Sequence, residues 1–357
     1  MTAVHHDDDL APEDPPERSA ADRARRARVT RRGLLIGGLA VVGLGGGALV
    51  YRNIRRSAGP VGTWVSLAPV LPVSVASPLP VSPAAETPGA VTVAAVWAHA
   101  DDDIIFANPG LADEIAAGNT VRAVFVTAGD AGKGLDYALG REAGLRAAYD
   151  EMRGSTAPWQ EHQITLLSGA RVTRFVPSDD PRLSITFMRL PDGGLDADGF
   201  AETGHVCVTR LINGSTSTVA TLDGSPDYDR ERLSATLVEL MGAAQPSRVT
   251  TNIPHESAFA RGDHPDHSAV GSLVRALAPT AGIDPEAVSY FIGYPSRNEP
   301  ANVSGAALDA KVHIYQTYAA DDSVVTCADA AACLGQRGFG EWLQRSYPKD
   351  ESELRLT

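Results

Sequence analysis

The chain has 357 residues, and its 43% apolar against 21% charged residues predict an ordinary hydrophobic core in one large domain or two small ones. Its formal charge of −13 is unevenly distributed, because residues 1–57 hold ten Arg against seven Asp and Glu and leave about −16 on the remainder. An acidic body argues against nucleic acid or an anionic membrane surface as the partner of the protein.

The N-terminal region is predicted to precede the folded domain. Residues 1–29 are polar, rich in Pro and Arg and without apolar periodicity, which is typical of a disordered tail. Residues 57–90 are rich in Pro, Ala, Ser and Val and are expected to form an extended linker.

Residues 30–56, between the tail and the linker, resemble a twin-arginine export signal. They begin with Thr-Arg-Arg-Gly-Leu-Leu, and the apolar run at 34–50 has 17 residues, the lower edge of a bilayer span. Seven Arg precede this run and three follow it, which predicts the N-terminus inside and the body outside. We therefore expect an exported protein, extracellular if the segment is cleaved and anchored in the membrane if it is not.

From residue 91 onward the pattern alternates between strands and helices. Residues 91–98 form a short apolar run with β-branched residues, which is typical of a buried parallel strand. A helix over 104–118, a strand over 121–127 and a helix over 139–152 are expected next. This alternation predicts an α/β fold with a Rossmann-like, mostly parallel sheet flanked by helices.

The second half of the chain continues the pattern after a β-rich insertion. Short β-like runs at 163–167, 172–176 and 183–190 are expected to form an additional β element beside the core. The later elements expected are a strand-like run at 205–211, a helix at 229–244, a strand at 248–253, a helix at 268–278, a strand at 288–293 and a helix from 305 to about 318.

We expect one catalytic domain over residues 91–325 and a C-terminal extension over residues 326–357. Cys327 and Cys333 in this extension could close a small loop by a disulfide, which is consistent with export. Cys207 is expected to be a buried small hydrophobe. Because no Cys pair has the Cys-x-x-Cys zinc spacing, no Cys is assigned to a metal.

Two clusters of His and Asp stand at the ends of predicted elements. Residues 99–103 follow the strand 91–98, and in open α/β sheets ligands bind beyond the carboxyl ends of the strands. Residues 262–267, Gly-Asp-His-Pro-Asp-His, precede a predicted helix. Each cluster alone could be a solvated loop or a helix cap. One His and one carboxylate from the first cluster with one His from the second form a set that suits a catalytic zinc or ferrous iron.

Together these motifs resemble the PIG-L/LmbE-like zinc deacetylases. The run Ala98-His99-Ala100-Asp101-Asp102-Asp103 is similar to that family's Ala-His-Pro-Asp-Asp-Glu signature, with Ala100 in place of Pro and Asp103 in place of Glu. Neither change removes a ligand, but the shorter Asp103 puts the contact of the family's Glu in doubt. Three later segments match in the family's order, within a resemblance over about residues 91–320: the Gly-rich turn 127–133, Arg141-Glu142 at a helix start, and His264-Pro265-Asp266-His267.

The resemblance implies Zn²⁺-dependent hydrolysis of an N-acetyl amide on an amino sugar or similar glycoconjugate. It implies that His99, Asp102 and His267 hold the metal and that Asp101 is the general base. From the residues alone, Asp101 and Asp102 are expected to point to opposite sides, because consecutive side chains at a strand end do so. Asp101 would then be a free carboxylate facing the attacking water.

Further residues have implied or candidate roles. The resemblance implies that His264 stabilises the tetrahedral intermediate or donates a proton, and that Asp266 orients or charge-balances His264. Arg141 is a candidate contact for a sugar or carboxylate, with a helix-surface Arg as the alternative, and Asp130 has a family-like position without a clear role. The loop after the strand 288–293 adds three candidate substrate contacts, Tyr294, Asn298 and Asn302.

Two other functions are compatible with the same residues. A non-catalytic sugar-binding protein of the envelope would keep the fold, but it has no need to retain Asp101, so the intact base argues against it. Redox chemistry on ferrous iron would use the same two-His, one-carboxylate set, and metal analysis of the purified protein would distinguish it from zinc hydrolysis.

Overall fold

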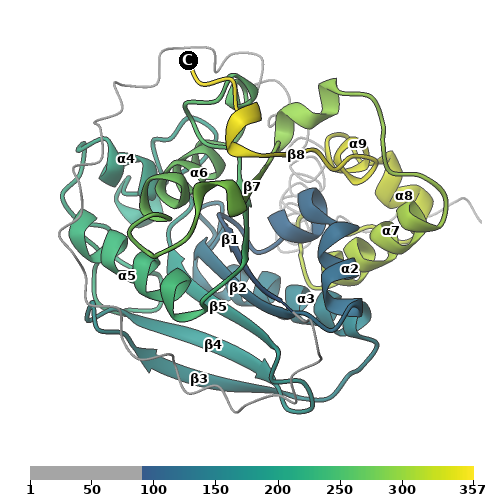
Figure 1. Ribbon diagram of the computed structural model, residues 1–357, viewed down its shortest axis with the longest axis horizontal. Helices are drawn as coiled ribbons and strands as arrows, with labels where there is room; N and C mark the ends of the chain where they lie inside the picture. Colours follow the sequence, from purple (N-terminus) through teal and green to yellow (C-terminus); the bar gives the residue numbers. More distant parts are fainter. Residues whose placement is uncertain (1–90) are drawn as a thin grey trace, which may run out of the picture. The chain divides into compact units, whose positions relative to one another are not determined.

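A computed structural model describes residues 91–357; the predicted tail, signal or anchor, and linker (1–29, 30–56 and 57–90) lie outside the described residues. Within the described part, no helix combines the length and apolarity needed to cross a bilayer. The strands are β1 (Thr92–Trp97), β2 (Thr120–Thr127), β3 (Trp159–Thr165), β4 (Arg171–Pro177), β5 (Leu183–Leu190), β6 (Arg248–Asn252), β7 (Val288–Phe291) and β8 (Pro348–Lys349). They form one sheet in the order β3-β4-β5-β2-β1-β6-β7-β8 (Figure 1).

The centre of the sheet is parallel. β1 pairs in parallel with β2 and β6, β2 with β5, and β6 with β7. The hairpin β3–β4 at one edge and the short β8 at the other are antiparallel. The predicted mostly parallel α/β sheet is therefore confirmed.

The β-rich insertion is part of this sheet rather than an element beside it. β3 and β4 extend one edge, and β5 lies inside the sheet between β4 and β2. Ser184, Thr186 and Arg189 interrupt the apolar residues of β5, so its sequence resembles a half-exposed strand, although all eight residues are buried. Burial of β5 on both faces follows from its place in the sheet, which its own pattern does not reveal.

Helices cover both faces of the sheet (Figure 1). On one face lie α4 (Val208–Ile212), α5 (Arg230–Ala243) and α6 (Pro265–Leu277). On the other face lie α2 (Gly110–Ala116), α3 (Leu135–Arg153), α7 (Gly305–Ala319), α8 (Ala330–Gly335) and α9 (Phe339–Leu343).

Two predicted elements differ from the structure. The helix predicted over 104–118 is divided into a π-helical turn, Asp103–Ala107, and α2, with Pro109 between them, because Pro has no N–H for a continuous helix. The strand predicted over 205–211 is wrong, since Val208–Ile212 is α4. Its apolar residues recur at a helical spacing, and so short a run fits either period. Cys207 precedes α4 and is fully buried, as predicted.

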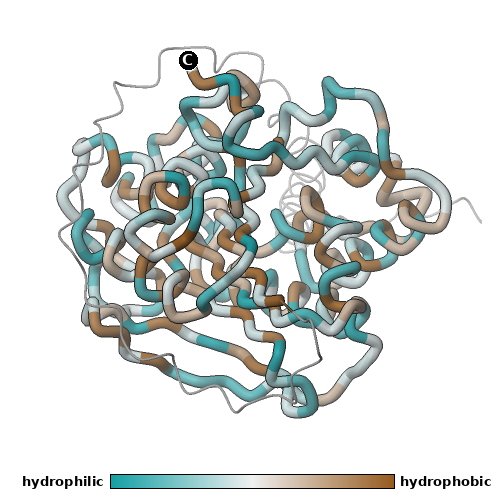
Figure 2. The backbone as a smooth tube through the Cα atoms, viewed as in Figure 1, coloured by the Kyte–Doolittle hydropathy of each residue, from teal (hydrophilic) through white to brown (hydrophobic). Residues whose placement is uncertain are grey.

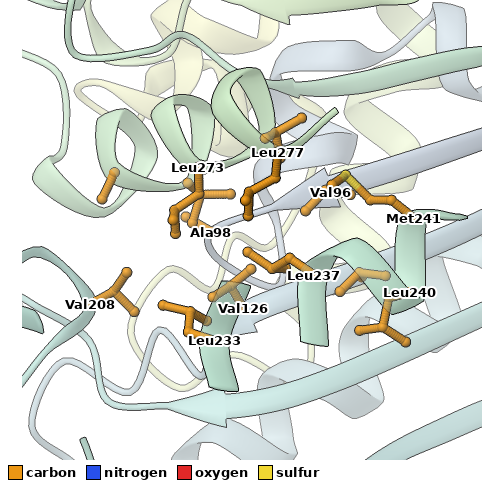
Figure 3. Close-up of a cluster of buried hydrophobic side chains, with 14 of the residues drawn as sticks. Val96, Ala98, Val126, Val208, Leu233, Leu237, Leu240, Met241, Leu273 and Leu277 are labelled. Carbon is orange, nitrogen blue, oxygen red and sulfur yellow. The ribbon is translucent and has the colours of Figure 1, made fainter. Parts of the chain in front are cut away.

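An apolar cluster on each face holds the helices to the sheet. Figure 3 shows Val96 and Val126 of the strands facing Leu237 of α5 and Leu273 of α6. In Figure 2 the hydrophobic segments gather in the central strands. Burying a Leu or Val side chain stabilises the fold by about 1.5–3 kcal/mol, so these contacts fix the strands whose carboxyl ends carry the polar clusters.

The C-terminal residues 326–357 pack against the rest of the domain. Cys327 and Cys333 form the predicted disulfide, with their Cα atoms 5.1 Å apart. Residues of α8 and α9 join the apolar cluster that includes α3 and α7. β8 adds a last antiparallel strand to the sheet by pairing with β7.

Lys311 on α7 is a buried basic residue, 1% exposed, whose Nζ donates one hydrogen bond to the carbonyl of Arg345 at 2.7 Å. Burial lowers its pKa from 10.5 to about 7. Between these values the unfolded chain binds the proton and the folded chain does not. Lys311 therefore destabilises the folded domain increasingly as the pH falls from about 10 toward 7.

We predict that the free energy of unfolding of Lys311→Met increases relative to that of the wild type as the pH falls from 10 to 7. The increase should be up to about 1.4 kcal/mol per pH unit. Urea unfolding of both proteins at pH 7, 8.5 and 10 measures this difference. Lys133→Met, at a position outside the buried core, is the control and should show no such trend. A stability difference between Lys311→Met and wild type that is constant across the three pH values would contradict the prediction.

Candidate metal centre

The two His/Asp clusters meet at the carboxyl end of the parallel strands. Residues 99–103 follow β1, and residues 264–267 open α6, with His264 as its N-cap. Asn252, the last residue of β6, connects to the first cluster. Its side-chain oxygen accepts a hydrogen bond from the N–H of Ala98 at 2.9 Å, and its amide group donates to Asp102 at 3.3 Å. The predicted meeting of the clusters in one site is thus present in the fold.

Three donor atoms of these clusters form a small triangle. His99 Nδ1 lies 3.1 Å from His267 Nε2, His267 Nε2 lies 3.0 Å from Asp102 Oδ1, and Asp102 Oδ1 lies 3.6 Å from His99 Nδ1. Ligands at about 2.0–2.2 Å from one zinc ion are roughly 3–3.5 Å from one another. All three residues are buried. The separations are those of three ligands on a single ion.

The opposite end of each donor side chain is bonded to the protein. His267 Nδ1 lies 2.9 Å from Asp263 Oδ1, and His99 Nε2 lies 3.3 Å from Asp266 Oδ2. Asp102 Oδ2 accepts a hydrogen bond from the N–H of His99 at 2.9 Å. With their outer nitrogens protonated, the two imidazoles direct lone pairs at each other, which is unfavourable unless a cation lies between them. Carboxylates on the outer nitrogen are usual around metal-bound His, so these residues fit a divalent cation.

The charges around the triangle also favour a cation. Burial disfavours the protonated form of His267, but Asp102 and Asp263 outweigh burial and raise its pKa to about 9. Burial likewise opposes protonation of His99, and again Asp102 outweighs it and raises the pKa. Burial disfavours the charged form of Asp102, yet His267 and His99 hold the pKa of Asp102 well below its usual range. Positive charge is therefore stabilised among these three side chains.

Asp101 lies beside the triangle and is paired with Arg141. Its Oδ1 is 2.6 Å from Arg141 Nη2, so the expectation of a free carboxylate is wrong. Burial raises the pKa of Asp101, and Arg141 opposes this effect. Asp102 points to His267 and Asp101 to Arg141, so the two neighbours diverge as expected. They do so in a turn entering the π-helical segment, not at a strand end.

Arg141 is held on several sides and is only 7% exposed, so the helix-surface alternative is wrong. It donates hydrogen bonds to the hydroxyl of Tyr318 at 2.7 Å and to the carbonyl of Gly129 at 2.5 Å, and it lies 3.4 Å from Asp322 Oδ2. Gly129 has φ +56°, and a Cβ there would overlap the Arg141 guanidinium, so this position requires glycine. A substrate contact of Arg141 stays a prediction; the structure places it as a support of Asp101.

Asp266 orients His99 rather than His264. Its Oδ2 lies 3.3 Å from His99 Nε2 but 4.0 Å from His264 Nδ1, and it accepts a hydrogen bond from the N–H of Gly193 at 2.8 Å. His264 Nδ1 accepts the backbone N–H of Asp266 at 3.1 Å. A neutral His264 therefore carries its proton on Nε2, which lies 3.7 Å from Asp192 Oδ1. Asp192, not Asp266, is the carboxylate that this proton faces.

Asp130 joins two loops at the edge of the site. Its Oδ1 accepts a hydrogen bond from the N–H of Asp192 at 3.0 Å, and its Oδ2 accepts one from Gly134 at 3.3 Å. A substrate role for Asp130 stays a prediction. Sequence reasoning missed Asp192, although it follows the buried strand β5 as residues 99–103 follow β1. The same strand-end criterion could have identified it.

An aromatic wall closes one side of the site. The ring of Tyr294 lies edge-on to His264 and His267, with centroids 6.0 and 5.1 Å away, and stacks on Trp342 at 4.2 Å with an interplanar angle of 8°. The indole N–H of Trp342 donates to the carbonyl of Tyr294 at 3.0 Å. Of the other loop candidates, Asn302 bonds to Ser346 instead. No local pattern predicts the contribution of Trp342.

We predict that replacing a residue of the donor triangle weakens zinc binding more than replacing a carboxylate that faces an outer nitrogen. His267→Ala should lose most bound zinc while the domain still folds, because the sheet core does not depend on the ion. Asp263→Asn keeps an oxygen but loses the charge facing His267 Nδ1, so zinc affinity should fall by about 10–100-fold. Competition with a chelator and elemental analysis measure both effects. The exposed His162→Ala should match the wild type, and stoichiometric zinc in His267→Ala would refute the ligand assignment.

Comparison with known proteins adds independent information on the chain. No curated protein sequence matches it. Among solved structures it resembles the N,N′-diacetylchitobiose deacetylase of Pyrococcus horikoshii, at 14% identity over 74% of this chain and 83% of that one, with a TM-score of 0.39. A conserved protein of Thermus thermophilus is 19% identical over 73% and 93%, with a TM-score of 0.37. A deacetylase of teicoplanin biosynthesis is 14% identical over 66% and 88%, with a TM-score of 0.35.

A family model agrees with the motifs and with the site that they form. The model described as PIG-L, GlcNAc-PI de-N-acetylase, matches residues 94–278, which is more than half of the chain. The matched segment contains every residue of the donor triangle and its flanking carboxylates. The chain therefore belongs to the PIG-L family and is a hydrolase of the deacetylase class.

Proposed function

We propose that this protein is a zinc-dependent N-deacetylase that acts outside the cytoplasm on an acetylated amino sugar or a similar glycoconjugate. The observation that carries the proposal is the triangle of His99, Asp102 and His267 donor atoms with the carboxylate of Asp101 beside it. The family description, a de-N-acetylase of a GlcNAc derivative, supports the class of substrate.

His99, Asp102 and His267 would hold the ion. When bound, a divalent ion supplies a Lewis acid for the amide carbonyl and lowers the pKa of a water beside it to about 7. Asp101 takes the proton of the attacking water as general base and returns it to the departing amine. Arg141 occupies Asp101 Oδ1 and leaves the other oxygen for this proton, so it positions the base.

His264 serves as a hydrogen-bond donor to the tetrahedral intermediate. Because its Nδ1 accepts a backbone N–H, the proton of the neutral ring is on Nε2, on the side of Asp192. A fixed N–H donor at a developing oxyanion typically contributes a factor of about 10²–10³ in turnover. Asp192 and the edge-on ring of Tyr294 keep the imidazole in this orientation.

Replacing each of the two neighbouring carboxylates in turn distinguishes the general base from the metal ligand. Asp101→Asn should retain zinc and lower turnover by about 10²–10⁴-fold, because the general base is removed. Asp102→Asn should instead weaken zinc binding, and added zinc should partly restore its activity. Acetate released from acetylated amino sugars, glycolipids and glycopeptides is measured for each variant, with bound zinc and thermal unfolding recorded alongside.

The outcomes of this experiment are distinct. Zinc lost from Asp101→Asn and kept by Asp102→Asn would reverse the two roles. If turnover survives in both variants, the deacetylase mechanism proposed here fails. The exposed Asp179→Asn, which also pairs with an arginine (Arg153), is the matched control and should retain turnover and zinc.

Export is the part of the proposal that rests on the N-terminal residues. Replacing Arg31 and Arg32 by Lys should prevent export and leave the protein in the cytoplasm, because the twin-arginine pathway requires the Arg pair. Fractionation of cells that express wild type or the double variant measures the result. Replacement of Arg55 and Arg56 by Lys, after the apolar run, is the control that keeps the pair. Unimpaired export of the Arg31/Arg32 variant would indicate a general signal or anchor.

A further inference from the structure

Two arginines converge on one face of the sheet, away from the metal centre. Arg122 of β2 lies opposite Ser184 of β5, and Arg174 of β4 lies opposite Thr186 of the same strand. Since Ser184 and Thr186 are two residues apart, both arginines point to the same face. Arg122 lies five residues before Thr127, the end of β2 nearest the metal centre, which is roughly 16 Å along the strand.

The two guanidinium groups are not neutralised by a carboxylate. Neither forms an ion pair with any residue in the described range. Within residues 91–357, Asp180 is the only carboxylate whose charge acts on Arg122, and Arg182 already binds Asp180 through two hydrogen bonds of 2.9 and 2.8 Å. The pKa of both arginines is lowered to about 10, by burial in Arg174 and by burial together with the charge of Arg174 in Arg122.

Much of the hydrogen-bonding capacity of the pair is unused. Arg122 Nη1 donates to the carbonyls of Pro181 and Arg182 at 3.1 and 2.8 Å. Toward the part of the chain that the structure describes, Arg174 donates only through Nε, to the hydroxyl of Thr186 at 3.2 Å. A guanidinium has five N–H donors, so each arginine retains donors for a ligand. The hydroxyl of Thr186 accepts from Arg174 and keeps its own proton to donate.

Both arginines line a cavity under α5. Its other lining residues include Thr186, Leu240 and the helix end at Ala243 and Ala244; Figure 3 shows Leu240 on α5 above the strands. The cavity has a volume of about 20 Å³, which is room for one small molecule or ion. The C-terminal end of a helix carries only about half a negative charge, so most of the two positive charges remains uncompensated.

We propose that this cavity binds a small monovalent inorganic anion of the size of chloride, held by Arg122, Arg174 and the hydroxyl of Thr186. The positive charge disfavours a cation, and the volume fits a single small ion. An anion between the guanidinium groups removes their repulsion and ties β2 to β4 across β5 beneath α5. The site is independent of the deacetylase chemistry, and its role is to stabilise this part of the sheet.

Thermal unfolding of the full chain in sodium chloride, balanced to constant ionic strength with sodium gluconate, tests the proposal. Gluconate is a much larger anion and serves as the reference. An anion that binds only the folded chain should raise the Tm by roughly 3 °C for each tenfold increase in chloride above its Kd. Arg174→Gln should abolish this rise, because it removes one of the two charges. Arg171→Gln, an exposed arginine on the same strand, should keep it.

A direct measurement decides the matter even if Arg174→Gln fails to fold. Wild-type crystals soaked in sodium bromide should show an anomalous peak between the two guanidinium groups, because bromide replaces chloride in such sites. A peak there supports the proposal. A Tm that does not depend on chloride, an equal rise in a folded Arg174→Gln, or bromide crystals without a peak in this cavity would each overturn it.

Discussion

The close approach of two imidazole nitrogens, His99 Nδ1 and His267 Nε2 at 3.1 Å, is the constraint on which the site depends. When both outer nitrogens carry the protons, two lone pairs face each other at this distance, and a cation between them removes their repulsion. Asp266 and Asp263 face the outer nitrogens, and Asp102 adds a negative charge beside the inner ones. The surrounding carboxylates therefore favour a positive charge at this point.

The parallel sheet makes this approach possible because it brings remote segments to one edge. Residues 99–103 and 264–267 are far apart in sequence but lie at the ends of neighbouring elements, and Asn252 of β6 bonds to both Ala98 and Asp102. The apolar clusters on both faces hold the strands in register. A cavity-forming substitution in the core would therefore disturb the triangle as well as the stability of the domain.

Sequence reasoning reached the parts of the site that are local. His99, Asp102 and His267 belong to short motifs, one after a strand and one at a helix start, and the resemblance of both motifs to the PIG-L/LmbE signature implies that they bind one ion. The partner of Asp101 was missed because Arg141 lies on α3, and its other supports, Tyr318 and Asp322, come from the end of the domain. Likewise the sequence of β5 indicates a peripheral strand, and only its pairing with β2 and β4 reveals that it is buried on both faces. Long-range pairing of this kind leaves no periodicity in the sequence.

The stack of Trp342 on Tyr294 has a consequence for the order in which the protein is made. His99 and Asp102 are translated early, and His267 follows 168 residues after His99. The aromatic wall is complete only when Trp342, close to the C-terminus, has been translated. A nascent chain that has emerged only through α7 thus contains its histidines and Tyr294, but not the Trp342 ring that stacks on Tyr294. Premature termination before residue 342 would yield a chain with its ligands but with the ring of Tyr294 unsupported on that side.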